Sequence, residues 1–318
     1  MNWALRCGPY AHLASLFEMY WGLPLPCIFI DEKGAYRMTS KGFHYPLAFT
    51  TLACPDWSWE QTVQKAVEYG YQGLELRGVE GEMDLTKAAP FTGNRLSATK
   101  RELKERGLAI PCLDTSCRFD QAAEIDTNIS EGKRHIDLAN ELDTPYIRVF
   151  GDRVPDIQSR EKIIKQVVEG LLALAHHAEG TRVQVLLESH GDFARVQNLL
   201  DVIQAVRHPQ VGVLWDVHHP FRFFSEPLAD TYEKLKDRIR HVHLKNSVAT
   251  DGGVRYTLMS HGDVPVVEVL RLLASGGYDG WIAFEWEKRW HPEIEEPEVA
   301  LPDFIRVLRA AEAQLDIL

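Results

Sequence analysis

The segment VGVLWDVHHPFRF, residues 211–223, is an apolar run that ends abruptly in acidic and imidazole side chains. Its first five residues are rich in β-branched and aromatic types, which predicts a short buried strand. Asp216, His218 and His219 follow at once. The polar residues at the end of such a strand either cap the strand or belong to a functional site. The rest of the sequence decides between these two interpretations.

The same alternation of an apolar strand with an amphipathic helix runs in both directions from this segment and begins near residue 45. Eight strands are predicted: YPLAFTTL (45–52), GLELRG (73–78), AIPCLDTS (109–116), YIRVFGD (146–152), VQVLLES (183–189), VGVLWDV (211–217), IRHVHLKN (239–246) and GWIAFEWE (280–287). A helix is predicted after each strand, over residues 57–71, 97–107, 131–142, 160–178, 194–206, 230–236, 266–274 and 301–315. Ser58 is the predicted N-cap of the first helix.

The number and type of these units predict the fold class. Near-continuous apolar strands are typical of parallel strands covered on both faces. Eight βα units have the size of a (β/α)8 TIM barrel, here a single α/β domain over residues 44–318. A doubly wound open sheet usually carries a glycine-rich turn after its first strand, and TTLACPDWS has no glycine. Residues 1–43 are predicted as an N-terminal extension: a private segment, a misassigned start, or a helix that plugs the barrel.

Composition limits the class of partner. Hydrophobic residues make up 45% of the chain and charged residues 25%, as in ordinary globular proteins. The net charge of −11 argues against nucleic acid, because phosphate backbones bind clustered Lys and Arg. Five cysteines without zinc-ribbon spacing, and no recognisable signal peptide, predict free thiols and a cytoplasmic location. Glu18, Pro24 and Pro26 interrupt the most apolar N-terminal stretch and argue against a membrane span.

Polar residues gather where the last four predicted strands end, and in TIM barrels the active site lies at the carboxyl ends of the strands. These strands end, in chain order, with Glu188; Asp216; His241 and His243 on one face; Glu285 and Glu287 on one face. Three carboxylates and one imidazole suit one divalent metal ion, Mn²⁺, Mg²⁺ or Co²⁺, with Zn²⁺ as a further candidate. Each residue alone could instead cap a helix or fill the core, but four together on neighbouring strands favour a metal site.

Other polar and aromatic residues near the strand ends have two interpretations each. Arg148 and Lys245 are predicted to bind a hydroxyl or anionic group of a substrate or, equally, to pair with the carboxylates Glu188 or Glu285. Glu75 and Arg77 are predicted as a structural pair at the barrel mouth. The remaining candidates are aromatic residues that either fill the core or form an apolar wall, and histidines that orient the ligands: Phe49, Trp57, Trp59, Trp286, Trp290, His190 and His218.

The motifs GYQGLELRG, LLESHG, LWDVHHP, HVHLKN and GYDGWIAFEWE resemble the sugar phosphate isomerase/epimerase superfamily of xylose isomerase-like TIM barrels. The resemblance covers residues 45–315 and implies one divalent ion, with Mn²⁺ favoured. It implies that the ligands are Glu188, Asp216, His243 and Glu285. It also implies that Glu188 and Glu285 form the acid/base pair and that His219 contacts the substrate. This chain departs from the common pattern at Asn246, where relatives often carry Asp, and at His261 in SHGDVP.

The resemblance implies an isomerase or epimerase of a small carbohydrate or polyol. A glutamate would remove a proton next to a carbonyl, and the metal ion would stabilise the enediolate. A lyase or dehydratase acting on a keto-inositol or 3-keto-glycoside is the alternative, because it shares the first step. A nuclease of the endonuclease IV type is disfavoured, since the second and third strands end in LELRG and CLDTS without histidine. A non-catalytic binding barrel and a homo-oligomeric assembly stay open.

Overall fold

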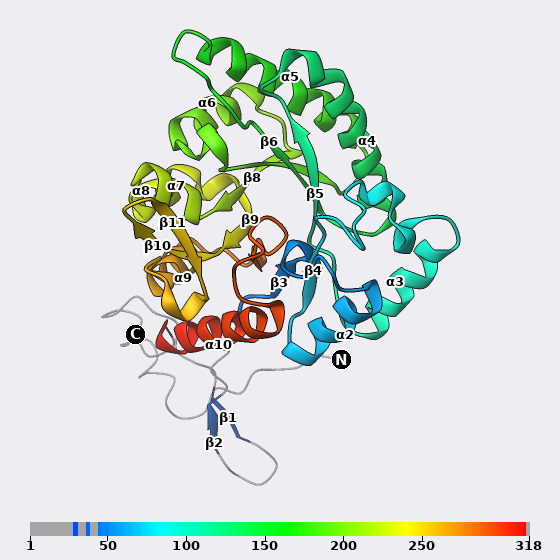
Figure 1. Ribbon diagram of the computed structural model, residues 1–318, viewed down its shortest axis with the longest axis vertical. Helices are drawn as coiled ribbons and strands as arrows, with labels where there is room; N and C mark the ends of the chain where they lie inside the picture. The colour runs from blue at the N-terminus through cyan, green and yellow to red at the C-terminus, as the bar shows by residue number, and fades with distance from the viewer. Residues whose placement is uncertain (1–27, 31–35, 39–43, 316–318) are drawn as a thin grey trace.

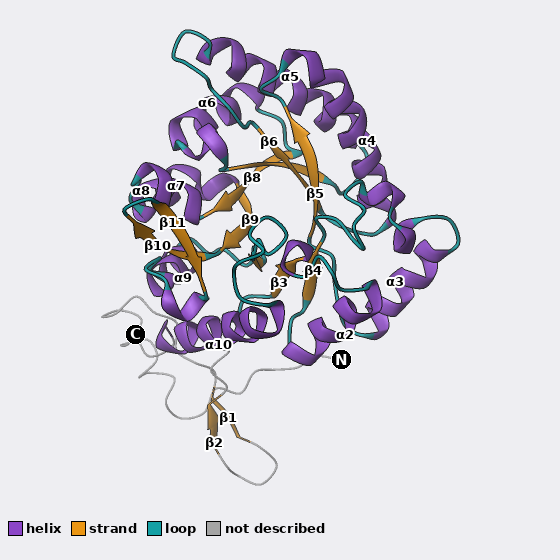
Figure 2. Cartoon of the chain, viewed as in Figure 1, coloured by secondary structure: helices purple, strands orange, loops and turns teal. Residues whose placement is uncertain are grey.

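Eight parallel strands form a ring, and each is followed by at least one helix, in the computed structural model, which describes residues 28–30, 36–38 and 44–315 (Figure 1). The barrel strands are β3 (Leu47–Thr50), β4 (Gly73–Glu75), β5 (Cys112–Arg118), β6 (Tyr146–Phe150), β7 (Gln184–Glu188), β8 (Val211–Asp216), β9 (Ile239–Leu244) and β12 (Ile282–Phe284). The helices are α2 (Trp59–Tyr69), α3 (Arg95–Glu105), α4 (Ile125–Glu141), α5 (Arg160–Ala178), α6 (Val196–Val206), α7 (His218–Phe224), α8 (Leu228–Leu235), α9 (Val266–Ser275) and α10 (Pro297–Leu315). Figure 2 shows the helices outside the ring of strands.

Hydrogen bonding between neighbouring strands closes the ring. The strand order is β4-β3-β12-β9-β8-β7-β6-β5, and every pair is parallel. Two further parallel bridges, Gly73 to Ala109 and Leu76 to Leu113, join β4 to β5. The predicted TIM barrel is therefore confirmed, and the carboxyl ends of all eight strands lie at one mouth.

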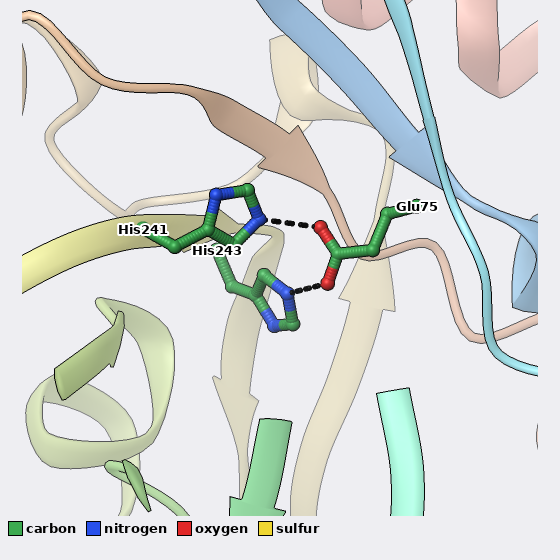
Figure 3. A group of neighbouring side chains, drawn as sticks. All are labelled: Glu75, His241 and His243. Carbon is green, nitrogen blue, oxygen red and sulfur yellow. Dashed lines mark hydrogen bonds and ion pairs between the residues drawn. The ribbon is translucent and has the colours of Figure 1, made fainter. Parts of the chain in front are cut away.

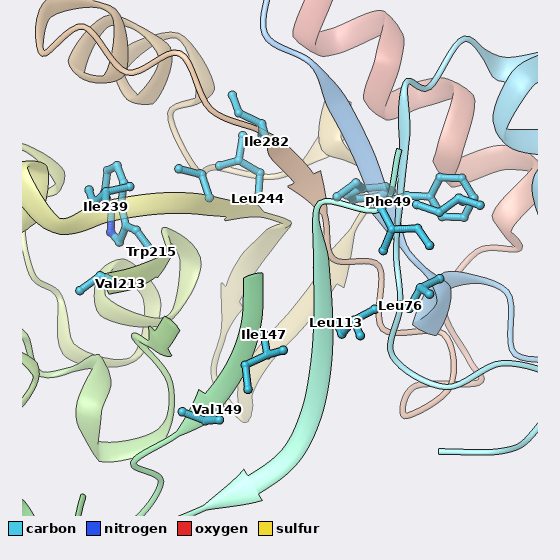
Figure 4. Packing of buried hydrophobic residues seen from close by; sticks show 14 of the residues in the cluster. Phe49, Leu76, Leu113, Ile147, Val149, Val213, Trp215, Ile239, Leu244 and Ile282 are labelled. Atoms are coloured by element: carbon cyan, nitrogen blue, oxygen red, sulfur yellow. The ribbon is translucent and has the colours of Figure 1, made fainter. Parts of the chain in front are cut away.

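Side chains alternate between the two faces of each strand, and this separates an apolar shell from a polar interior. Residues that point toward the helices are apolar, for example Ile147 and Val149 of β6 and Val213 and Trp215 of β8 (Figure 4). The positions between them point toward the barrel axis. Near the carboxyl ends these inward positions carry charged or imidazole side chains, all of them buried: Glu75, Asp114, Arg148, Glu188, Asp216, His241 and His243.

Three differences between the observed and the predicted elements bear on the fold. Helix α4 begins at Ile125, six residues before its predicted start, because the buried face of its first half carries Asn128, Gly132 and His135, which produce no apolar period. Helix α7 follows β8 directly and was not predicted. A hairpin of β10 (Asn246–Thr250) and β11 (Gly253–Thr257) follows β9, and its Asp-Gly-Gly turn is a recognisable hairpin signal in the sequence.

The N-terminal segment contains a short antiparallel pair, β1 (Ile28–Ile30) with β2 (Tyr36–Met38). The rest of the predicted extension, residues 1–43, lies outside the described residues. No helix in the described part of the chain combines the length and apolar character that a membrane crossing needs.

Candidate metal centre and active site

Four side chains of metal-ligand type meet at the carboxyl end of the barrel and are here called the ligand cluster: Glu188, Asp216, His243 and Glu285. One oxygen or nitrogen atom from each lies within 4.8 Å of the others, and all four residues are buried. They are the four predicted metal ligands, so the structure brings the predicted set together. Their role as ligands stays a prediction.

Strand register brings the members of the ligand cluster to the same end of the barrel. Glu188 and Asp216 are the last residues of β7 and β8, and Asp216 lies opposite His243 of the neighbouring strand β9. Ala283 of β12 lies opposite His243 on its other side, so Glu285 is two residues further along and faces the same way. Parallel pairing of adjacent strands therefore delivers one ligand-type side chain from each of four strands.

The donor set fits a divalent cation. Among the described residues, Oε1 and Oε2 of Glu188, Oδ2 of Asp216 and Nδ1 of His243 are buried without a hydrogen-bond partner. Two of these atoms, Glu188 Oε2 and Asp216 Oδ2, also lie within ion-pair distance of the buried cations Arg148 and Lys245. Glu188 Oε1 and His243 Nδ1, 3.5 Å apart, are therefore the atoms that indicate a missing cation, because buried polar atoms are normally satisfied. Carboxylate oxygens with one imidazole nitrogen are suitable ligands for Mn²⁺, Mg²⁺ or Zn²⁺.

Glu75, at the end of β4, holds His243 from the side opposite to the cluster (Figure 3). Its two oxygens bind Nε2 of His241 and Nε2 of His243, and all three residues are buried. Burial alone would raise the pKa of Glu75, but the charges of His243 and His241 lower it well below the usual value. An ionised Glu75 accepts the Nε2–H of His243, which leaves Nδ1 free to face the carboxylates of the cluster.

Arg148, inside β6, forms buried ion pairs rather than a free binding group. Its Nε lies 3.2 Å from Glu188 Oε2 and its Nη2 lies 3.2 Å from Asp114 Oδ2. Burial alone would raise the pKa of Glu188, but the charge of Arg148 lowers it. Glu188 is therefore held ionised, as a proton acceptor must be. This pairing is the second of the two predicted roles of Arg148.

Lys245, just beyond β9, is the second buried cation at the mouth. Its Nζ lies 3.0 Å from Asp216 Oδ2 and 2.7 Å from Glu287 Oε1, and it also binds Glu285. Burial lowers the pKa of Lys245, but these three carboxylates raise it well above the usual value. Burial raises the pKa of Asp216 to about 7 even though Lys245 acts in the opposite direction. Of the two roles predicted for Lys245, the structure therefore shows the pairing with carboxylates.

His219, the predicted substrate contact, begins the short helix α7 beside the cluster. Its backbone N–H donates to Asp216 Oδ1 at 2.9 Å, and its Nε2 is buried without a hydrogen-bond partner. Its ring centroid lies 4.6 Å from that of His190, and the ring of His190 lies 4.6 Å from Phe150. His218 Nε2 binds Ser247 Oγ at 2.7 Å. These rings form one side of the barrel mouth.

Most of the aromatic candidates belong to the core. Phe49 packs edge-on against Tyr71 with centroids 4.9 Å apart, and Trp286 stacks on Phe284 at 5.6 Å. Trp290, by contrast, is half exposed. The departure at Asn246 has a structural role, because its amide binds backbone atoms of the loop that leads to α9, including N of Val264 at 2.9 Å.

Several residues of the site were missed or misassigned from the sequence. Glu75 binds two histidines and not Arg77, so the predicted pair of Glu75 with Arg77 is wrong. Asp114, which pairs with Arg148, was not singled out. Both residues end a predicted strand, and that position is the signal that could have identified them.

The fold and the cluster together define a TIM barrel with three carboxylates and one imidazole at its mouth. The chain belongs to the xylose isomerase-like TIM barrel family, whose model matches residues 63–311. This agrees with the resemblance predicted from its motifs.

Individual relatives include enzymes of two reaction types. The chain is 25% identical over 199 residues to 3-dehydroshikimate dehydratase of Bacillus anthracis, which covers 61% of this chain and 68% of that protein. It is 26% identical over 159 residues to fructoselysine 3-epimerase of Shigella flexneri. That alignment covers 48% of this chain and 56% of the epimerase. A xylose isomerase-like TIM barrel protein from Mycobacterium smegmatis, solved in complex with magnesium, superimposes with a TM-score of 0.64 at 17% identity, over 86% of this chain and 98% of that one.

Proposed function

We propose that this chain is a divalent-metal-dependent isomerase or epimerase of a sugar or polyol. The observation that carries the proposal is the convergence of two buried glutamates on one atom of His243. Nδ1 of His243 lies 3.5 Å from Glu188 Oε1 and 3.4 Å from Glu285 Oε1. Glu188 ends β7 and Glu285 follows β12, and these strands lie on opposite sides of β9 in the sheet order. Two carboxylates that reach one binding position from different strands can exchange a proton with opposite faces of one substrate carbon.

Glu188, Asp216, His243 and Glu285 would hold the metal ion. When bound, a divalent cation polarises a substrate carbonyl and stabilises the negative charge that develops on its oxygen. Mn²⁺ is the favoured ion, with Mg²⁺, Co²⁺ and Zn²⁺ as the other candidates, because carboxylates supply most of the donor atoms.

The two glutamates supply the proton chemistry. Burial alone would raise the pKa of Glu285, but Lys245 and His243 lower it well below the usual value, so this carboxylate is ionised at neutral pH. Either glutamate can therefore remove the proton next to the carbonyl. If the opposite glutamate first takes up a proton from solvent, it can return that proton to the other face and invert the carbon, which is epimerisation. Return of the abstracted proton by the first glutamate to the neighbouring carbon is isomerisation. His219 would contact a substrate hydroxyl through Nε2, which has no hydrogen-bond partner among the described residues.

A dehydratase or lyase is the second candidate function, and the 3-dehydroshikimate dehydratase relative favours it. The first step is the same proton abstraction. A hydroxyl group on the β carbon then leaves as water, for which a protonated acid must be close. The glutamate that removed the proton now carries it and can pass it to the leaving hydroxyl, so the proton transfer balances within the pair Glu188 and Glu285.

The remaining predictions form part of this proposal. The substrate is a small carbohydrate, and neither nucleic acid nor a membrane is a partner. Cys54, Cys112 and Cys117 are buried free thiols, which supports the predicted cytoplasmic location. Assembly into a homo-oligomer stays a prediction.

Proton exchange detected by NMR in D₂O tests the proposed function. Purified protein is incubated with Mn²⁺ and a panel of ketoses, keto-inositols and 3-keto-glycosides. We expect the C–H signal next to the carbonyl of at least one compound to disappear, and the product then separates epimerase from lyase.

Glutamate variants provide the controls for this experiment. Glu188→Gln and Glu285→Gln should each lower the exchange rate by about a hundredfold or more. Glu179→Gln, at an exposed glutamate that follows α5, should leave the rate unchanged. Exchange that persists at the wild-type rate in both cluster variants would contradict the assignment of the acid/base pair.

A further inference from the structure

Two arginines at the barrel mouth carry buried N–H groups that no described acceptor binds. Arg77 follows β4, and Arg289 follows β12 in the loop that contains Glu285. Nη1 of Arg77 and Nε of Arg289 are both buried and without a hydrogen-bond partner among the described residues. A buried charged donor without an acceptor is costly, so such atoms are rare in proteins unless a water, an ion or a ligand completes them.

The backbone holds the two arginines beside one another. The N–H of Arg77 donates to Thr51 Oγ1 at 2.8 Å, and the N–H of Arg289 donates to the carbonyl of Leu52 at 3.1 Å. Both are thus tied to consecutive residues that follow β3. Their side chains line the same small cavity of about 10 Å³, and Arg289 alone also lines an adjacent groove of about 390 Å³ into which a larger group can fit.

Neither guanidinium forms an ion pair with a carboxylate of the residues that the structure describes. Arg77 Nη2 donates to Ser116 Oγ at 3.0 Å, and the guanidinium of Arg289 lies 5.2 Å from the ring centroid of Trp290. Glu80 lines the same cavity, but its Oε1 accepts the backbone N–H of Trp59. The described ion pairs of the mouth involve Arg148 and Lys245 instead.

The positive charge of Arg77 is compensated only by carboxylates that do not contact it among the described residues. Burial, followed by the like charge of Arg148, lowers the pKa of Arg77 to about 10, although Asp114 and Glu131 act in the opposite direction. In a chain of net charge −11, two cations without a direct carboxylate partner at the mouth of the barrel require an explanation. An incoming anion would supply both the missing acceptors and the missing charge, and guanidinium groups match carboxylate and phosphate in geometry.

We propose that Arg77 and Arg289 form an anion subsite that binds a carboxylate or phosphate group of the substrate. The inference rests on the proposed function and narrows its substrate class to a polyhydroxylated carbonyl compound that carries an anionic group away from the reacting carbon. Arg77 lies near Arg148, which contacts Glu188, and Arg289 follows Glu285 in the chain. The subsite is thus beside the ligand cluster, on the side of β3 and β4.

Isothermal titration of the full chain in Mn²⁺ tests the subsite without requiring turnover. The probes are D-glucose, D-glucuronate and D-glucose 6-phosphate, which share one ring and differ at one carbon. We expect at least one of the two anions to bind about tenfold or more tightly than D-glucose, because charge-assisted hydrogen bonds are formed. The anion that binds better separates a carboxylate subsite from a phosphate subsite.

Methionine variants assign the effect to the two arginines. Arg77→Met and Arg289→Met should remove the preference for the anion, whereas Arg153→Met, at an exposed arginine in the loop after β6, should retain it. Thermal unfolding is measured beside the titration. A ligand-binding role predicts a melting temperature that is unchanged or higher in the variants, because an unpartnered buried charge has been removed, and a structural role predicts a lower one.

The outcomes separate this inference from the proposed function. Equal affinity for D-glucose and both anions, or a preference that survives in both arginine variants, overturns the subsite and indicates that a buried water completes the two N–H groups. Loss of C–H exchange in Glu285→Gln concerns only the ligand cluster. An anion preference without exchange in any compound would retain the subsite and overturn the proposed reaction.

Discussion

Among single residues, Glu75 shows how a side chain outside the ligand cluster can control it. His243 can present Nδ1 to the cluster only if its proton is on Nε2, and Glu75 is the acceptor of that proton. The same carboxylate also binds His241, so it is fixed from two sides. A buried carboxylate in this position selects one tautomer of the imidazole and limits its rotation.

Replacement of Glu75 by glutamine should weaken metal binding. The amide of glutamine has one accepting oxygen, so it cannot accept a proton from both imidazoles at once. We expect the dissociation constant for Mn²⁺ to rise by about ten- to a hundredfold in Glu75→Gln. Titration of the wild type and the variant with Mn²⁺ measures the affinity.

Glu312→Gln is the matched control for this variant. Glu312 is also a buried glutamate that binds a histidine, with Oε2 at 2.9 Å from Nδ1 of His44, but it belongs to α10 and is not part of the cluster. Its variant should retain the wild-type Mn²⁺ affinity. If both variants bind Mn²⁺ as the wild type does, Glu75 has no influence on the site.

His218 predicts a loss of stability in acid. Burial, followed by the charges of Lys245 and Arg222, lowers the pKa of His218 from 6.5 to about 2. The unfolded chain therefore binds a proton below about pH 6.5 that the folded chain does not, and the free energy of unfolding falls as the pH decreases from there. Between pH 6.5 and 5 this one residue should contribute a loss of about 2 kcal/mol.

Urea unfolding at pH 7.5 and pH 5 measures this contribution. His218→Gln retains a group that can bind Ser247 Oγ but cannot titrate, so the variant should lose less stability between the two pH values than the wild type. An equal loss in both proteins would mean that other groups determine the acid sensitivity.

Residues that end a strand were predictable, but their partners were not. Glu188 and Asp216 each end an apolar run, and this position in the sequence is sufficient to place them at the barrel mouth. That Arg148 binds Glu188, or that Glu75 binds His243, depends on how the strands are staggered around the ring. The spacing of residues along the chain carries no information about that stagger. The partners of Arg148 and of Glu75 could therefore not be predicted from the sequence.

At the scale of elements, repetition made the barrel recognisable while individual boundaries varied. Helix α5 spans the predicted residues 160–178, because its apolar residues recur with a clear helical period. Helix α4 begins earlier than predicted, since Asn128, Gly132 and His135 occupy its buried face. The hairpin of β10 and β11 lies between β9 and α9 and interrupts the alternation of strands and helices. It was not predicted, because the alternation led us to expect a helix directly after β9.

The predicted cap of α2 is confirmed and provides a test of local stability. Ser58 Oγ accepts the backbone N–H of Gln61 at 3.1 Å. Ser58→Ala removes this acceptor and should lower the free energy of unfolding by about 1 kcal/mol. Ser130→Ala, within α4, removes a hydroxyl that only donates to the carbonyl of Asp126, and it should change stability by less than about 0.5 kcal/mol. Urea unfolding of both variants makes the comparison, and equal losses would contradict the capping role.

For the whole molecule, the barrel interior combines an apolar shell with a strongly acidic centre. Within this centre two buried cations, Arg148 and Lys245, face a larger number of buried carboxylates: Glu75, Asp114, Glu188, Asp216 and Glu285. Burial raises the pKa of both Asp114 and Asp216 to about 7, and neighbouring carboxylates add to this rise while Arg148 and Lys245 oppose it. The closed barrel excludes water from this charge, so a bound cation has a large effect on the folded state.

Metal binding should therefore stabilise the whole fold. Only the folded chain brings the four ligands together, so Mn²⁺ at a hundred times its dissociation constant should raise the free energy of unfolding by about 2.7 kcal/mol. Addition of a chelator should reverse the effect. In Asp216→Asn, which replaces a charged ligand by a neutral amide, most of the increase should disappear at the same Mn²⁺ concentration. Thermal unfolding with and without Mn²⁺ measures both proteins. An increase of the same size in the variant would show that the ion binds elsewhere, and the absence of an increase in the wild type would remove the metal from the proposed mechanism.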